Sequence, residues 1–172
     1  RVTVTLNGAS YSGVVSNGSA SITIAASGLQ ALTDGHDYDI GVSVSDVDGN
    51  STSGSSSFSV EATAPTVTAF SSSTADGSYN AGDTITITAT TSESVVAGSI
   101  LTVTLDTGDS ITLTAAANGT SLTGTYTVSA GDTSSDLTVT GITAANVTDL
   151  AGNTLTDMTL PTGHNVADSS AI

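Results

Sequence analysis

Apolar and polar residues alternate with a period of two along most of this chain, which is the pattern of a half-buried β-strand. In the opening segment, Val2, Val4 and Leu6 alternate with threonine. The same alternation predicts strands near 1–6, 21–26, 39–46, 58–62, 83–90, 100–105, 110–115, 125–130 and 136–142. Asn-Gly and Asp-Gly pairs, which close hairpins, separate many of them. Residues 26–35 have helical character, enough for one turn. Short strands with frequent turn signals predict an all-β fold of the sandwich type.

One turn sequence occurs twice, and this repeat predicts two modules. VSDVDGNST at 44–52 resembles VTDLAGNTL at 147–155, and the two turn aspartates, Asp46 and Asp149, lie 103 positions apart. About 100 residues is the size of one small sandwich domain. The strand pattern restarts after Pro65, which cannot donate to a central ladder. The sequence therefore predicts a first module at 1–62 and a second at 63–172.

The first module is expected to be incomplete at its N-terminus. Asp149 lies 84 residues after Pro65. If the two modules have similar lengths, the first would begin roughly 38 residues before Arg1 and would lack about two strands here. The alternative is a smaller sandwich of five strands.

Charge and composition exclude several classes of function. The chain has 172 residues, 16 acidic side chains, one arginine, no lysine and a net charge of -15. Nucleic acids and anionic lipid surfaces are bound through lysine and arginine, so neither is an expected partner. Cysteine is absent, which excludes disulfides and thiolate metal sites. No apolar stretch approaches the roughly 20 residues that cross a membrane. Most of the acids are aspartates, which suit turns and also suit Ca²⁺.

The residues do not predict an enzyme. His36 and His164 lie in turn-like sequences, and Asp37 and Asp39 alternate along the start of a strand, as solvated side chains do. No serine lies in a Gly-x-Ser-x-Gly elbow. Rows of Thr-x-Thr would also suit an ice-binding face, but outward-facing threonine in any strand gives the same pattern.

Tyr38 has a structural interpretation. It stands at the entry to the strand predicted at 39–46, as in the tyrosine corner of immunoglobulin-like sandwiches. The sequence therefore predicts that its hydroxyl bonds to backbone a few residues upstream.

Two long stretches carry a family resemblance. The first runs from VTVTLNGASYSGVV to SFSVEATAPTV, and the second from APTVTAFSSSTADGSYNAGDTITITATTSESV to VTDLAGNTL. Both resemble the immunoglobulin-like repeats of large, exported, RTX-type bacterial surface adhesins. The resemblance covers nearly the whole chain, through the order of its turns and the Ala-Pro joint. It implies tandem immunoglobulin-like β-sandwiches that extend a binding tip from the cell surface, with neighbouring repeats as partners and Ca²⁺ stiffening the joints.

The immunoglobulin-like strand order also predicts which acids meet. The last inter-strand turn and the turn near 91–95 share the N-terminal pole of the second module. We therefore expect Glu93, Asp149 and Asn153 to converge there, with Glu61 arriving from the joint. Carboxylates and an amide without cationic neighbours would satisfy a structural Ca²⁺.

By the same topology, further acids would face neighbouring modules. Asp46, Asp48 and Asn50 would face a preceding module; Asp76 and Asp83, with Asp132, would face a following one. The alternative is that all of these are ordinary turn formers. At the level of function, the alternative to a spacer is a module that binds a glycan or a protein through its loops.

Overall fold

The chain divides into two compact units. The computed structural model describes the backbone of residues 1–172 and every side chain except that of Ala144. The first unit is Arg1–Thr63 and the second Ala64–Ile172, a boundary one residue away from the predicted one. Strands make up 46% of the chain and helices 5%, so the predicted all-β class is confirmed. None of the described helices is long and apolar enough to cross a membrane.

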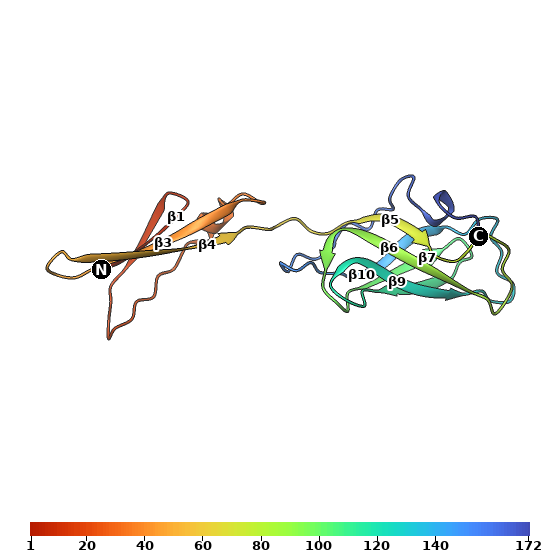
Figure 1. Cartoon of the computed structure of the whole chain (residues 1–172), viewed down its shortest axis with the longest axis horizontal. Coiled ribbons are helices and arrows are strands. Elements are labelled where there is room, and N and C mark those ends of the chain that lie inside the picture. The colour runs from red at the N-terminus through yellow and green to blue at the C-terminus, as the bar shows by residue number, and fades with distance from the viewer. The chain divides into compact units, whose positions relative to one another are not determined.

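The first unit is one antiparallel sheet of four strands (Figure 1, red to orange). Its strands are β1 (Val2–Leu6), β2 (Ala9–Gly13), β3 (Asp37–Ser45) and β4 (Ser51–Ser59), in the order β2-β1-β3-β4. Asn7 and Gly8, both with positive φ, form the tight turn between β1 and β2.

The predicted apolar face of this sheet exists but is not buried. The register places Val2 opposite Val44, Val4 opposite Val42 and Leu6 opposite Ile40, so these side chains share one face. Only Leu6 is buried, whereas Val42 and Val44 keep more than a third of their surface exposed. The face is open because the unit contains no second layer to cover it.

Two predicted strands differ from the structure: the strand predicted at 58–62 lies mostly outside β4, which ends at Ser59, and the strand predicted at 21–26 is absent. Residues 21–25 belong to no strand, and the short helix α1 (Ala26–Gln30) follows directly. Ile22 and Ile24 still alternate with polar residues, and Ala25 is extended. A segment with strand sequence and no strand to pair with stays irregular. The predicted helical turn within 26–35 is confirmed.

The tyrosine corner is confirmed as a contact. The Tyr38 hydroxyl accepts a hydrogen bond of 2.8 Å from the backbone N–H of Thr33, five residues upstream. Its ring lies 6.1 Å from that of Phe58 on the neighbouring strand. The hydrogen bond and the ring contact together fix Tyr38 at the start of β3.

The second unit is a curled antiparallel sheet of six strands (Figure 1, yellow to blue). Its strands are β5 (Val67–Ser72), β6 (Thr84–Val95), β7 (Ile100–Leu105), β8 (Ser110–Thr114), β9 (Gly119–Thr127) and β10 (Val139–Asn146), in the order β10-β7-β8-β9-β6-β5. Register shifts interrupt β5, β6 and β10. Such irregularities bend strands and increase their twist, and so favour a curled sheet.

The core of this unit lies inside the curl. On β6, Ile85, Ile87 and Ala89 are at most 2% exposed and alternate with threonines that are not buried. Leu101, Val103, Leu113 and Leu122 on β7 to β9 are fully buried. The period-two pattern therefore predicts the inward face correctly.

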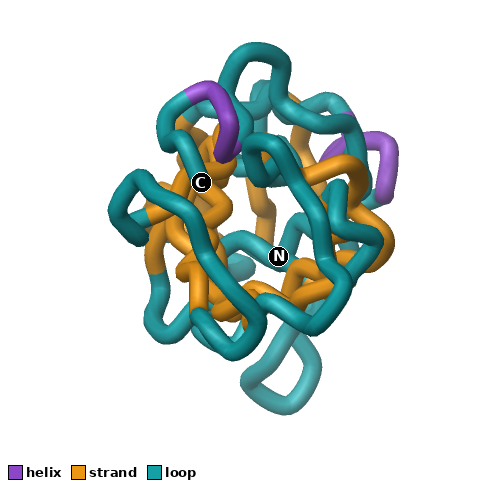
Figure 2. The backbone as a smooth tube through the Cα atoms, turned by 90° about the vertical axis from the view of Figure 1, so that its right-hand side faces the viewer, coloured by secondary structure: helices purple, strands orange, loops and turns teal.

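The C-terminal segment covers the gap between the two edge strands. Phe70 on β5 donates its backbone N–H to His164 O, at 2.7 Å. The Asn165 side chain bonds both the N–H and the C=O of Val139 on β10, at 2.9 and 2.8 Å, and also caps the 3-10 helix η1 (Val166–Asp168). Figure 2 shows η1 beside the C-terminus.

Candidate metal centre

The repeated turn has the same hydrogen-bond structure in both units. In the second unit, Asp149 Oδ1 accepts from the backbone N–H groups of Ala151, Gly152 and Asn153, at 2.8, 2.6 and 2.8 Å. Asp149 Oδ2 accepts from Asn153 Nδ2 at 2.8 Å, and the Asp149 N–H donates to Asn153 O at 3.0 Å. The aspartate therefore organises the whole turn, while Gly152 supplies the positive φ.

In the first unit, Asp46 repeats this arrangement. Its Oδ1 accepts from the N–H groups of Asp48 and Asn50, at 3.0 and 2.8 Å, and its Oδ2 from Asn50 Nδ2 at 2.8 Å. These bonds, led by the Asn50 amide, lower the pKa of the Asp46 carboxyl. The repeated sequence thus encodes a repeated turn. In each copy the Asp carboxylate accepts hydrogen bonds from backbone N–H groups and from the side-chain amide of the Asn.

The two turns differ in burial and in what lies beside them. Asp46 is exposed, whereas Asp149 is only 2% exposed. Asp149 forms an isolated bridge with Val95 at the end of β6, and Val96 donates its N–H to Thr148 O at 2.8 Å. The turn of the second unit is therefore tied to its sheet.

Glu93 lies beside this turn. A register shift between Thr90 and Val95 frees the end of β6 from regular pairing with β9. Thr91 Oγ1 donates to Glu93 O at 2.7 Å and helps to fix the irregular stretch. The half-buried Glu93 then offers a carboxylate oxygen within 4.8 Å of one of Asp149.

This acidic pair could hold a metal ion. Its ligand atoms are carboxylate oxygens, which Ca²⁺ and Mg²⁺ prefer. No lysine or arginine occurs in the second unit. The Asn153 amide is held against Asp149 and adds a neutral group to the site. As the topology predicts, Glu93, Asp149 and Asn153 meet at one end of the second unit.

Glu61 belongs to the last residues of the first unit. It is exposed, and its Oε1 accepts from the Thr63 N–H at 2.8 Å. Nearby, Asp34 accepts hydrogen bonds from the Ala62 N–H at 2.7 Å and from the Thr63 hydroxyl. The side chains of Asp34 and Glu61 thus hold the backbone at residues 62 and 63.

Asp76 and Asp83, two other predicted ligands, bond to backbone N–H groups. Asp76 Oδ1 accepts from the Ala171 N–H at 2.9 Å, and Asp83 Oδ2 from the Asn80 N–H at 2.8 Å. The described residues bring neither of them into a group of three acids, and the same holds for Asp46 and Asp48. A site that these acids complete with a neighbouring module stays a prediction.

Sequence reasoning missed a cavity at the opposite end of the second unit, around Tyr126 and Asp132. Its signal was a tyrosine at an inward position of β9, because a buried hydroxyl needs a partner.

Comparison with protein-family models, with curated proteins and with solved structures found no match.

Proposed function

We propose that this chain is a pair of immunoglobulin-like spacer modules from a large exported bacterial surface adhesin, and that Ca²⁺ stiffens the joint between them. The observation that carries the proposal is the short distance, at most 4.8 Å, between a carboxylate oxygen of Glu93 and one of the buried Asp149. Two carboxylates held so close repel each other. A divalent cation bound between them attracts both and outweighs that repulsion.

We predict Glu61 as a third ligand, because it lies three residues before the second unit begins. Thr66 is fastened beside Glu93, because its N–H and C=O bond to Ser92 at 3.0 and 2.9 Å. Glu61 lies five residues before Thr66, a distance along the chain of at most about 18 Å. A cation bound by Glu61, Glu93 and Asp149 would therefore restrain the residues that join the units.

Removal of calcium tests the proposal. We expect the second unit to melt at a higher temperature with Ca²⁺ than with excess EGTA. At a hundredfold excess over the dissociation constant, Ca²⁺ should add about 2.7 kcal/mol to the free energy of unfolding. Glu93→Gln should abolish this response, because it removes one ligand charge. Asp157→Asn, at an exposed acid outside the group, should keep it.

Two further measurements complete this test. Elemental analysis should find bound calcium in the parent protein and in Asp157→Asn. Small-angle scattering should report fewer interunit conformations with Ca²⁺ than with EGTA, and Glu61→Gln should remove that difference. Equal melting temperatures in both buffers, with no bound metal, would contradict the proposal.

The proposal includes an incomplete first module, and the two units support this. In the first unit, β1 lies between β2 and β3 in the sheet, and the repeated turn follows β3 along the chain. In the second unit, β7 lies between β8 and β10, and the repeated turn follows β10. Residues 21–25 fall between β2 and β3, as β9 falls between β8 and β10. Since β9 pairs with β6, residues 21–25 would pair with an upstream strand equivalent to β6.

Hydrogen exchange checks this prediction. We expect the amides of 21–25 to exchange rapidly in the chain Arg1–Ile172. In a chain extended upstream by about 38 natural residues they should become protected, because a new strand would pair with them. The β4 amides, which already pair with β3, are the internal control. Equal exchange of 21–25 in both chains would favour the smaller sandwich.

A binding module is the second candidate function. It is favoured by one observation, the cavity at the end of the second unit opposite Glu93.

A further inference from the structure

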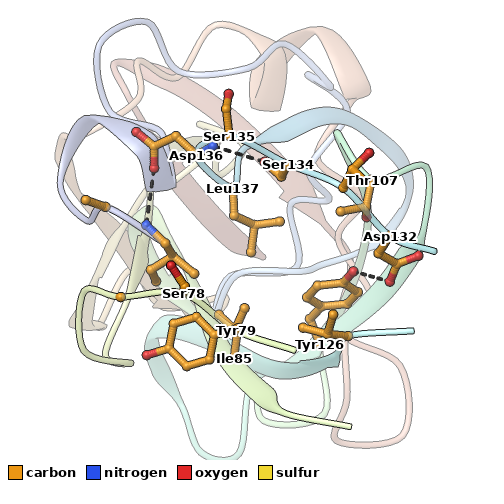
Figure 3. A pocket seen from close by; sticks show the side chains of 15 residues that line it. Ser78, Tyr79, Ile85, Thr107, Tyr126, Asp132, Ser134, Ser135, Asp136 and Leu137 are labelled. Atoms are coloured by element: carbon orange, nitrogen blue, oxygen red, sulfur yellow. Dashed lines mark hydrogen bonds between the residues drawn. The ribbon is translucent and has the colours of Figure 1, made fainter. Parts of the chain in front are cut away.

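A cavity of about 430 Å³ opens at the end of the second unit where β6 begins and β9 ends. This volume lies within the range of small-molecule sites. Its walls come from the turn at 77–79, the loop at 132–137 and the chain end at 171–172. Figure 3 shows these side chains around one opening.

The floor of the cavity is apolar. Ile85 and Leu137 are buried members of the core, and Val128 and Ile172 pack against it. Tyr79 and Tyr126 add two aromatic rings on one side, as Figure 3 shows. Such a surface suits an alkyl chain and, through the ring faces, a cation.

Two carboxylates stand on different sides of this floor. In Figure 3, Asp132 lies beside Tyr126, and Asp136 lies across Leu137 from it. Asp132 Oδ2 accepts from the Tyr126 hydroxyl at 2.5 Å and from the Ser129 N–H at 2.6 Å, while Asp136 Oδ1 accepts from the Ile172 N–H at 3.3 Å. The Tyr126 hydrogen bond lowers the pKa of Asp132, so this group is charged at neutral pH.

The cavity also contains a polar atom that lacks a partner. Thr107 lines it, and the Thr107 Oγ1 atom is buried without a hydrogen bond among the described residues. A buried hydroxyl without a partner costs stability until a ligand bonds to it. The Thr107 side chain lies near the Tyr126 hydroxyl, so it belongs to the Asp132 side of the cavity and favours an occupant with a polar group there.

We propose that this cavity binds a linear aliphatic diamine in its doubly charged form. One ammonium would bond to Asp132 and Thr107, the other to Asp136, and the methylene chain would lie on Ile85 and Leu137. Anions are excluded, because the unit has no lysine or arginine to receive them. The described acids of this cavity form no group of three that lie close enough together to share one metal ion.

Calorimetric titration of the whole chain tests the proposal, with 1,3-diaminopropane, putrescine and cadaverine as probes and excess EGTA present. We expect saturable binding with one site, weakened by salt, and at least tenfold weaker binding of butylamine, which has a single charge. Asp136→Asn and Asp132→Asn should each lower the affinity for the best diamine about tenfold or more. Thr107→Val should lower it several-fold.

Asp157→Asn is the matched control, since it removes the same charge at an exposed site outside the cavity. It should leave the affinity unchanged. A melting curve of each variant shows whether the second unit is still folded, and Asp136→Asn preserves the Tyr126–Asp132 bond if Asp132→Asn does not fold.

Three results would overturn the proposal. The first is no saturable binding of any diamine at millimolar concentration. The second is an equal loss of affinity in Asp157→Asn, which would mean attraction to overall charge. The third is binding of a neutral sugar such as galactose in the cavity without binding of a diamine. None of these results depends on the calcium response.

Discussion

Replacing Asp149 by alanine is expected to lower the free energy of unfolding of the second unit by about 3 kcal/mol or more. Its Oδ1 accepts from three backbone N–H groups, and the residue is only 2% exposed. Alanine would leave these donors without their acceptor where water has little access. Urea unfolding in excess EGTA measures this loss without any contribution from metal. Hydrogen exchange of the β6 amides reports the unfolding of the second unit.

The repeated turn provides the control. Asp46→Ala removes the same kind of carboxylate from the exposed turn of the first unit, where water can replace it. We expect a clearly smaller loss, confined to the first unit. Equal losses from Asp46→Ala and Asp149→Ala would show that burial does not govern the strength of this turn.

Gly124→Ala is expected to destabilise the second unit by about 3 kcal/mol. A Cβ atom at Gly124 would lie 2.3 Å from Thr112 O on β8 and 2.8 Å from the Leu113 side chain. The first contact is with backbone, which cannot turn away, so β8 and β9 would have to separate. The absence of a side chain at this position allows the two strands to approach closely.

Gly141→Ala on β10 is the matched control, because a Cβ atom there meets nothing within 4 Å. Its effect should be less than about 0.5 kcal/mol in either direction. Urea unfolding of both variants, read from the same β6 amides, gives the comparison. A Gly124→Ala protein as stable as Gly141→Ala would show that the strands tolerate the side chain.

The alternation of apolar residues predicted the second unit well and the first only in part. Ile85, Ile87 and Ala89 are buried because other strands surround them. Val42 and Val44 have the same pattern and remain partly exposed. Periodicity identifies which side chains share a face, but burial requires a second layer, and no local pattern reports whether that layer is present.

The candidate site was predictable to the extent that topology orders the turns. Glu93 and Asp149 lie 56 positions apart, yet the strand order brought them to one end of the second unit. Sequence could not show that Asp149 is buried and Asp46 exposed, because the two turns have nearly the same residues. It also could not show the cavity near Tyr126, which is assembled from four distant segments.

The hydrogen bonds between the C-terminal segment and the start of the second unit have a consequence for the order of folding. The Asp76 carboxylate accepts from the Ala171 N–H across 95 positions of sequence, and Phe70 on β5 bonds to His164. Contacts of such long range form late and slow the search for the native state. During synthesis, β5 to β10 would leave the ribosome before the segment that covers their edges. The two edge strands of the nascent unit would therefore stay uncovered until its last residues emerge.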